Sequence, residues 1–535
     1  MPRQLYRVLG SLIVVMGVSG ELLAQYDPNA PEPISKIRGS LLLHGGGPVA
    51  DNVRAAFVEL AGGRRARIVV IPTADVDAAG TEDRLEGWSQ FAPSTVSFLH
   101  AETRAAALQP HFASALSDAT GVWIGGGKQS RLGEIYVDTP VEAALCAVIT
   151  RGGVVGGTSA GAAITSHVMI VRGEERQGLD LFPGAIIDQH FLKRNRQERL
   201  QKIVDAHPDR VGFGIDEETA LILHGRSLKV IGESEVIVCI AASKTRPVRI
   251  DRLTAGKTAD LIALSRAAQA RTQPPFPPAK PASPDVKQGS LVIVGGGGMP
   301  RELVTRFIEL AGGPDSPIIV IPCVEQETVD NDSFIDTLRK AGATNVKQLH
   351  TKDRRRANED DEFLTPLKTA RGIWFGGGRQ WNLVDSYQNT TAHKLMHEVL
   401  ARGGVIGGSS AGASIQSDYM PRGNPLGNLD IMSEGYEQGL GFLTGVAIDQ
   451  HFSQRKRFAD MTSLVQTHPQ LLGIGIDEAT ALVVHGHEAE IVGKGNVAFF
   501  DANQKDADSD TDYVSVPAGK RYDLKARRVI AKASD

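Results

Sequence analysis

The residues with the clearest chemical potential are the small residues and the serine of the sequence GGTSAGA at 156–162. This sequence follows an apolar run at 154–155 and contains the pattern Gly-x-Ser-x-Gly, in which small neighbours let a serine sit on a sharp strand-to-helix turn. The N–H group of Ala160 would then point toward an oxyanion that forms on the substrate. A glycine-rich phosphate loop is the alternative, but strand, small residues, serine and helix together favour Ser159 as a nucleophile.

A second sequence of the same kind, GGSSAGA at 407–413, lies in the other half of the chain. Its Gly-x-Ser-x-Gly spacing selects Ser410 rather than Ser409 as the nucleophile and Ala411 as the oxyanion donor. The chain therefore contains two candidate centres.

A serine nucleophile needs a base, and histidine is the usual one. Three pairs of histidines recur at matched places after the two serines: His190 with His451, His207 with His468, and His224 with His485. The second and third pairs lie at the ends of an expected helix and strand, where histidines often cap or pack. His190 and His451 follow a strand and have polar neighbours, so we predict that they are the bases.

The third group of such a centre is an acid that orients the imidazole and stabilises its charged form. The sequence GIDEE at 214–218 offers three carboxylates, and its counterpart GIDEA at 475–479 eliminates Glu218. Asp216 and Glu217 point to opposite faces of a strand, so only one of them can face the base. The strand pattern alone does not choose between them.

Glycines and arginines near these motifs are further candidates. Two triple-glycine turns follow strands and allow backbone N–H groups to approach a substrate oxygen, although an ordinary turn is nearly as good an interpretation. The predicted second oxyanion donors are Gly126, Gly127, Gly377 and Gly378. Arginines follow both candidate bases, either as a solvated helix start or as part of a binding site. They are Arg194, Arg196, Arg199, Arg455 and Arg457.

These motifs belong to a domain that is duplicated in the chain. LLLHGGGPV at 41–49 recurs as LVIVGGGGM at 291–299, and AIIDQHF at 185–191 recurs as VAIDQHF at 446–452. Copy two carries ten extra residues between its serine and histidine motifs. Short β-branched runs alternate with helical stretches, which predicts an α/β fold with a doubly wound, mostly parallel sheet in each copy and a short C-terminal β segment. Ligands bind such sheets at the carboxyl ends of the strands, where the motifs lie.

The remaining sequence sets the domain limits and the compartment. Arg3 and Arg7 precede an uncharged run that is too short to span a bilayer, which predicts a secretory signal, with a buried N-terminal helix as the alternative. We expect a mature protein that is exported to the periplasm or outside the cell, without a membrane segment. The predicted parts are a signal peptide at 1–24, copy one at 38–265, a proline-rich linker at 266–288 and copy two at 289–535.

Composition excludes several classes of protein. The 58 basic and 62 acidic residues give a net charge of −4, so no overall charge points to nucleic acid or an anionic membrane. The three cysteines lack the spacing of a metal site, and we predict no metal and no cofactor.

Taken together, GGTSAGA, DQHF followed by Arg-x-Arg, and GIDE-x-TAL resemble the cyanophycinase family of serine exopeptidases, relatives of the α-aspartyl dipeptidase with the class I glutamine-amidotransferase-like fold. The order serine, histidine, acid argues against α/β-hydrolases, in which the acid precedes the histidine. The resemblance covers nearly all of each copy and decides in favour of the glutamate as the acid. It implies two catalytic triads, Ser159-His190-Glu217 and Ser410-His451-Glu478.

The resemblance also implies a substrate. Family members release β-Asp-Arg dipeptides from cyanophycin, a polyaspartate that carries arginine on each side chain, through an acyl-enzyme. It further implies substrate-binding roles, with arginines holding carboxylates and Asp188 meeting a guanidinium. The residues concerned are Gln129, Asp188, Gln189, Arg194, Arg196 and Arg199, with Gln380, Asp449, Gln450, Arg455 and Arg457 in copy two.

The copies depart from the family pattern in different ways. Asp460 stands where copy one has Arg199, which reverses a charge in the expected pocket of copy two. Because family members pair as homodimers, the tandem chain is expected to imitate such a pair. An α-aspartyl or other isopeptide dipeptidase, and a non-catalytic binding protein with the same pocket, remain as alternative functions.

Overall fold

The computed structural model describes residues 36–77, 86–330, 332–504 and 511–531, so the expected signal at 1–24 lies outside the described residues. The chain divides into two compact units. The first unit contains Pro31–Pro278 together with Asn424–Glu437, and the second contains Ala279–Gly423 and Gln438–Asp535. The boundary at Pro278 falls inside the expected linker, whose first part forms the end of helix α9 (Leu261–Thr272).

The main sheet of the first unit has eight strands in the order β14-β11-β10-β1-β5-β4-β2-β3. The five strands from β1 to β3 in this order are parallel, and β10, β11 and β14 add antiparallel strands at one edge. The strands are β1 (Ser40–His44), β2 (Arg67–Ile71), β3 (Thr95–Phe98), β4 (Gly121–Ile124), β5 (Val154–Thr158), β10 (Thr219–His224), β11 (Ser227–Gly232) and β14 (Thr258–Asp260).

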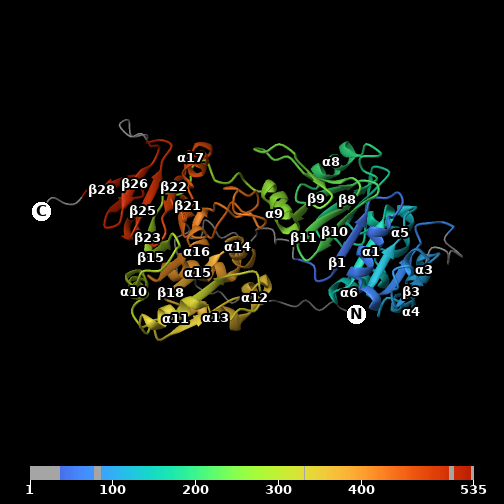
Figure 1. Ribbon diagram of the computed structural model, residues 1–535, viewed down its shortest axis with the longest axis horizontal. Coiled ribbons are helices and arrows are strands. Elements are labelled where there is room, and N and C mark those ends of the chain that lie inside the picture. The colour runs from blue at the N-terminus through green and yellow to red at the C-terminus, as the bar shows by residue number, and fades with distance from the viewer. Residues whose placement is uncertain (1–35, 78–85, 331, 505–510, 532–535) are drawn as a thin grey trace, which may run out of the picture. The chain divides into compact units, whose positions relative to one another are not determined.

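Alternating apolar residues explain why this sheet is covered on both faces. In β1, Leu42 packs with Phe57 of α1 (Asp51–Leu60), whereas Leu41 and Leu43 belong to the core that contains Leu145 of α6 (Pro140–Thr150). Neighbouring side chains of a strand point to opposite faces, so a strand with three consecutive buried leucines requires a covering layer on each side. Figure 1 shows these helices around the blue and cyan strands.

A second sheet of the first unit has the order β13-β12-β9-β8-β6-β7, and its strands β6, β8 and β9 run parallel. Its strands are β6 (Val168–Val171), β7 (Glu174–Gln177), β8 (Ala185–Gln189), β9 (Val211–Ile215), β12 (Glu235–Ile240) and β13 (Arg249–Thr254). The remaining helices of this unit are α2 (Glu86–Ser89), α3 (Arg104–Ala107), α4 (Pro110–Ser114), α5 (Gln129–Tyr136), α7 (Ala160–Ala163) and α8 (Gln197–Ala206), with a 3-10 turn at Gly63–Arg65.

The second unit repeats this design with sheets of nine and five strands, in the orders β17-β16-β18-β19-β15-β23-β24-β27-β28 and β20-β21-β22-β25-β26. Its strands are β15 (Val286–Val294), β16 (Ile318–Cys323), β17 (Val346–Gln348), β18 (Gly372–Gly378), β19 (Val405–Ser409), β20 (Ser417–Tyr419), β21 (Leu443–Gln450), β22 (Leu472–Ile476), β23 (Thr480–Gly486), β24 (Glu488–Gly493), β25 (Asn496–Phe500), β26 (Val514–Pro517), β27 (Arg521–Asp523) and β28 (Arg528–Ile530). Its helices are α10 (Arg301–Leu310), α11 (Ser333–Lys340), α12 (Arg354–Glu359), α13 (Asp361–Thr369), α14 (Trp381–Tyr387), α15 (Thr391–Ala401), α16 (Ala411–Ser414) and α17 (Phe458–Thr467).

The predicted fold class, two copies of a doubly wound and mostly parallel α/β unit, is confirmed. Among the described residues, no helix combines the length and the apolar character that crossing a bilayer requires.

Candidate active site

The two serines occupy the same strained turn in both units. Ser159 lies between β5 and α7 with φ 51° and ψ −110°, and Ser410 lies between β19 and α16 with φ 57° and ψ −115°. Positive φ values are costly for residues with a side chain, and such strain concentrates at functional sites. A side-chain carbon on Gly161 would lie 2.0 Å from Ile124 O, so this turn requires glycine there.

Each serine is hydrogen-bonded to its predicted base. Ser159 Oγ lies 2.8 Å from His190 Nε2, and Ser410 Oγ lies 2.9 Å from His451 Nε2. His190 directly follows β8, and its φ of 48° turns the ring back toward the serine. Burial lowers the pKa of both histidines, although the hydrogen bonds that they donate to their glutamates oppose this effect. Both rings are therefore neutral and able to accept a proton near pH 7.

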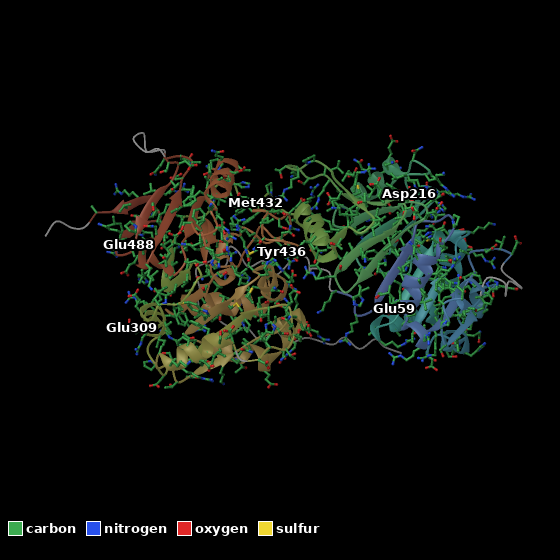
Figure 2. All side chains as sticks on the ribbon, in the orientation of Figure 1. Glu59, Asp216, Glu309, Met432, Tyr436 and Glu488 are labelled. Carbon is green, nitrogen blue, oxygen red and sulfur yellow. The ribbon has the colours of Figure 1, made fainter. Side chains whose placement is uncertain are left out.

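The glutamates rather than the neighbouring aspartates contact the bases. His190 Nδ1 lies 2.6 Å from Glu217 Oε1, and His451 Nδ1 lies 2.6 Å from Glu478 Oε1. Asp216, labelled in Figure 2, instead accepts the N–H groups of Leu192 and Lys193 at 3.0 and 2.9 Å. The aspartate thus holds the segment after the histidine, while the glutamate orients the imidazole.

The last residue of the first strand in each copy and the glycines after it bind the backbone of the serine, of the histidine and of the residue after the glutamate. In copy one, His44 O accepts Ser159 N–H at 2.9 Å, and Gly45 O accepts His190 N–H at 2.7 Å. Gly46 O accepts the N–H of Glu218, the residue after Glu217, at 2.9 Å. The carbonyls of Val294, Gly295 and Gly296 do the same in copy two, at 3.0, 2.7 and 2.7 Å.

Sequence reasoning did not assign a function to this segment. A side-chain carbon on Gly46 would lie 2.2 Å from His190 Cε1, so the close approach of the backbone requires glycine. The duplicated HGGG and VGGG sequences at 44–47 and 294–297 were the signal that could have found it.

The predicted oxyanion glycines lie beside the serines to different degrees. A side-chain carbon on Gly126 would lie 3.3 Å from Ser159 Cβ, and one on Gly377 would lie 3.6 Å from Ser410 Cβ. Gly127 and Gly378 both have φ of +143° and make the turn that brings their neighbours to the serine. Ala160 and Ala411 are the first residues of α7 and α16, directly after the two serines.

Most predicted substrate-binding residues of copy one form a single network. Asp188 is buried and pairs with Arg196 at 3.3 Å and with Arg199 Nε at 2.7 Å. Gln189 donates to Gln129 Oε1 at 3.0 Å and also contacts Arg196. Arg194 is exposed and lies outside these contacts. The carboxylate of Asp188 is thus already neutralised by arginines of the protein itself.

In copy two, the buried carboxylate of Asp449 is neutralised differently. Arg457 Nη1 lies 2.6 Å from Asp449 Oδ1, and Arg422 Nε lies 2.9 Å from Asp449 Oδ2. Arg422 also donates to Asp460 Oδ2 at 2.7 Å. Sequence reasoning missed Arg422, which replaces the guanidinium that Arg199 provides in copy one.

The other predicted residues of copy two flank this cluster. Gln450 accepts from Arg457 at 2.5 Å, and Gln380 donates to Pro421 O at 2.8 Å. Arg455 is exposed, like Arg194 in copy one.

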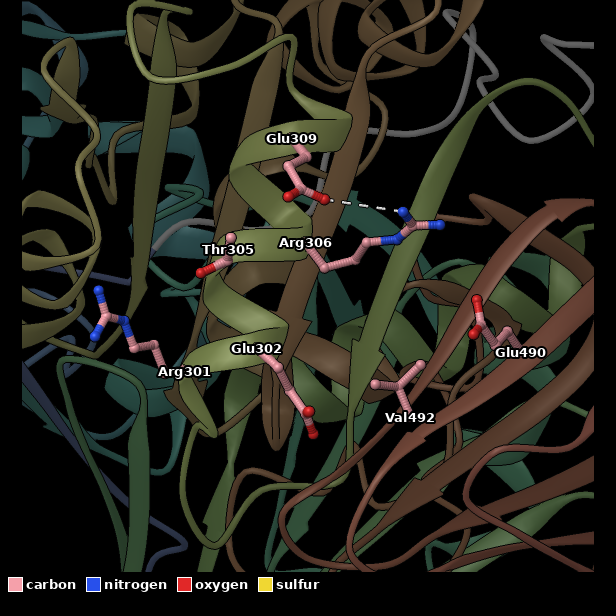
Figure 3. Close-up of a pocket in the computed structure, with 7 residues that line it drawn as sticks. All are labelled: Arg301, Glu302, Thr305, Arg306, Glu309, Glu490 and Val492. Atoms are coloured by element: carbon pink, nitrogen blue, oxygen red, sulfur yellow. Dashed lines mark ion pairs between the residues drawn. The ribbon is translucent and has the colours of Figure 1, made fainter.

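A shallow depression of about 570 Å³ lies elsewhere, between α10 and β24 (Figure 3). Its charged residues include Arg306 and Glu309, which form an ion pair at 3.9 Å. It contains none of the predicted site residues. Among the described residues, no group of histidine, cysteine, aspartate and glutamate side chains is arranged to hold a metal ion.

Comparison with known proteins identifies the family of the chain. The model of peptidase family S51 matches residues 41–231 and again 291–492. A cyanophycinase of Geminocystis herdmanii is 32% identical over 221 residues, which are 40% of this chain and 81% of that protein. A cyanophycinase of Thermosynechococcus vestitus is 35% identical over 207 residues, 38% of this chain and 63% of that protein.

A solved structure of a peptidase from an acI-B1 Actinobacterium is 25% identical, with a TM-score of 0.35, and the match covers 42% of this chain and 98% of that one. The match of the family model to both copies confirms the family that the sequence motifs indicate. The chain therefore belongs to peptidase family S51 and is a serine-type peptidase with two copies of the family's domain.

Proposed function

We propose that the chain is an exported serine exopeptidase that releases β-Asp-Arg dipeptides from cyanophycin through two Ser-His-Glu triads. The observation that carries this proposal is the continuous hydrogen-bonded series from Ser159 through His190 to Glu217, repeated in copy two with the same spacing. The substrate class is supported by the similarity of the chain to proteins named cyanophycinase.

The first half of the reaction forms an acyl-enzyme. His190 Nε2 accepts the hydroxyl proton as Ser159 Oγ attacks the scissile carbonyl carbon, and Glu217 stabilises the imidazolium that forms. N–H groups next to the serine stabilise the oxyanion of the tetrahedral intermediate. The imidazolium then gives its proton to the leaving amine, and an ester with Ser159 remains.

The second half of the reaction regenerates the enzyme. His190 takes a proton from a water molecule, which attacks the ester carbonyl, and the released Ser159 oxygen recovers a proton from the imidazolium. The bonds made and broken balance without a metal, an oxidant or an organic cofactor.

The test uses the full chain with both serines replaced, Ser159→Ala together with Ser410→Ala. We expect the double variant to lose dipeptide release from cyanophycin by a factor of about 10³ or more. Each single variant reports the activity of the other copy. Unchanged release in the double variant would refute the proposal.

A parallel assay compares dipeptide release from cyanophycin with hydrolysis of an α-linked Asp-Arg dipeptide, because the β-linked dipeptide is the expected product. Hydrolysis of the α-linked dipeptide without dipeptide release from cyanophycin would replace the proposed substrate while leaving the serine mechanism in place. Export is tested separately, by sequencing the N-terminus of the protein recovered from the periplasm or the medium. A mature chain that still begins at Met1 would contradict the expected signal.

A further inference from the structure

A histidine inside the first catalytic unit has no role in the proposed reaction and no counterpart in the second unit. His44 is the last residue of β1, and its side chain is fully buried. The equivalent residue at the end of β15 is Val294. Both residues use the backbone carbonyl in the same way, because each accepts the N–H of the candidate nucleophile.

The side chain of His44 makes contacts that valine cannot make. His44 Nδ1 lies 2.8 Å from Thr158 Oγ1 and accepts the N–H of Gly46 at 3.3 Å. Thr158 directly precedes Ser159 in the strained turn, and Gly46 packs against the ring of His190. One side chain therefore joins the segment that carries the nucleophile to the segment that supports the base.

The hydrogen-bonding pattern also assigns the tautomer. Because Gly46 N–H donates to Nδ1, this nitrogen carries no proton, and the Thr158 hydroxyl donates to it as well. The proton of the neutral ring is then on Nε2, which is buried and has no hydrogen-bond partner among the described residues. Burial first, and then the charges of His190 and Arg54, lowers the pKa of His44 to about 4, so the ring is neutral at pH 7.

Folding of the unit does not explain a histidine at this position. The second unit builds the same carbonyl contacts with Val294, so the backbone arrangement does not need an imidazole. Burying an N–H donor without a partner costs stability, and a valine side chain carries no such donor. The cost is offset only by what the ring does to Thr158 and Gly46.

We propose that His44 is a positioning residue of the first catalytic centre, which fixes the Ser159 turn relative to the His190 ring and makes the two centres differ in rate. The proposal rests on the nucleophilic role proposed for Ser159. It predicts that removing the imidazole slows acylation of Ser159 without destabilising the fold.

The experiment measures the rate at which a fluorophosphonate labels Ser159 in the full chain carrying Ser410→Ala, so that only one nucleophile reacts. We expect His44→Val, which introduces the residue of the second copy, to slow labelling by about tenfold. His44→Asn places an amide oxygen near the position of Nδ1, and we expect it to keep the rate within about twofold. The melting temperature of His44→Val is expected to stay close to that of the parent, because losing the unpartnered Nε2–H offsets losing the hydrogen bonds from Thr158 and Gly46.

Leu42→Val is the matched control, because Leu42 is buried on the same strand and points to the same face as His44. We expect it to lower the melting temperature but to leave the labelling rate within about twofold. The combination of His44→Val with Thr158→Val should cost less than the sum of the two single effects, because both remove the same hydrogen bond.

The outcomes separate this proposal from the proposed function. A parent protein whose Ser159 is not labelled would overturn the proposed function and the role of His44 together. A labelled parent whose rate is unchanged by His44→Val would overturn the role of His44 alone. Slow labelling in both His44→Asn and Leu42→Val would also overturn it, because any change in β1 would then have the same effect.

Discussion

The two copies keep the same Ser-His-Glu geometry but neutralise the aspartate that precedes each Gln-His pair in different ways. The Ser–His distances are 2.8 and 2.9 Å, and both His–Glu distances are 2.6 Å. The aspartate that precedes each Gln-His pair is buried in both units, at 1% and 0% exposure of its residue surface. A buried carboxylate needs paired charges, and each copy provides two guanidinium groups.

The guanidinium groups come from different elements. In copy one, Arg196 and Arg199 both follow the histidine on or next to α8, whereas in copy two Arg457 is joined by Arg422 from the segment after β20. Counted from the two serines, Val171 stands at the place of Arg422 in copy one, and the adjacent Arg172 is exposed. The comparison indicates that the buried aspartate requires two guanidinium groups. The second group can come from the helix after the histidine, as in copy one, or from the segment after β20, as in copy two.

The accessible charge differs as a result. The side chain of Arg199 is 26% exposed, whereas Arg422 is 4% exposed and the partly open position on the helix is taken by Asp460. Copy one therefore presents a guanidinium where copy two presents a carboxylate.

The largest effect is expected where the copies are the same. Glu217→Gln in a chain with Ser410→Ala, and Glu478→Gln in a chain with Ser159→Ala, should each lower dipeptide release by about 10³- to 10⁴-fold. An amide cannot stabilise the imidazolium and favours the wrong tautomer. Glu198→Gln on the exposed face of α8 is the control. If only one of the two substitutions lowered dipeptide release, the two centres would differ in activity despite their equal Ser–His and His–Glu distances.

The second prediction concerns the cations that differ between the copies. Arg422→Ala leaves the buried Asp449 with one arginine and should lower the free energy of unfolding of the second unit by about 3–5 kcal/mol. Burial already raises the pKa of Asp449, against the opposing charges of Arg457 and Arg422. Arg172→Ala is the matched control and should change the free energy by less than about 0.5 kcal/mol.

Urea unfolding of the full chain measures both changes, and hydrogen exchange in β21 localises the first of them. Equal effects of the two substitutions would refute the assignment of Arg422.

The third prediction converts the ion cluster of copy two into that of copy one. Asp460→Arg added to Arg422→Ala should restore roughly half or more of the lost free energy of unfolding, because an arginine at this position of α17 corresponds to Arg199. The same urea measurement tests it. A double variant as unstable as Arg422→Ala alone would show that the helix of copy two cannot direct a guanidinium to Asp449.

The sequence predicted the fold and the side chains that the structure brings together at the candidate site, because both depend on local patterns that occur twice. Ser159 and His190 were found from residue type and spacing, but the strand pattern left Asp216 and Glu217 open, and the family resemblance chose the glutamate. Arg422 was missed because it reaches Asp449 through space from a segment whose length differs between the copies.

The glycine segment after β1 was missed for another reason. It acts through backbone carbonyls. Every residue type has the same carbonyl group, so the sequence does not indicate which carbonyls form these hydrogen bonds. The sequence indicates this segment only through Gly46, because the His190 ring leaves no room for a side chain at that position.

The smallest effect concerns the exposed arginines that are the same in both copies. The base must be neutral to accept a proton, and burial lowers the pKa of His190 and His451 below 6.5, so the acid limb of the activity profile should lie below pH 6.5. Arg194 and Arg455 contribute to this lowering. Replacing either arginine by alanine should raise the pKa of its histidine and move the acid limb upward by about 0.3 pH unit.

The pH dependence of fluorophosphonate labelling, measured in each single-serine chain, tests this last prediction. Because both arginines are exposed, the shift should shrink when the salt concentration rises to about 1 M, where charges are screened over roughly 3 Å. A shift that persists in high salt would mean that the substitution has moved the histidine rather than removed a charge. A shift in the opposite direction would contradict the electrostatic explanation, since losing a nearby cation can only make protonation of the imidazole easier.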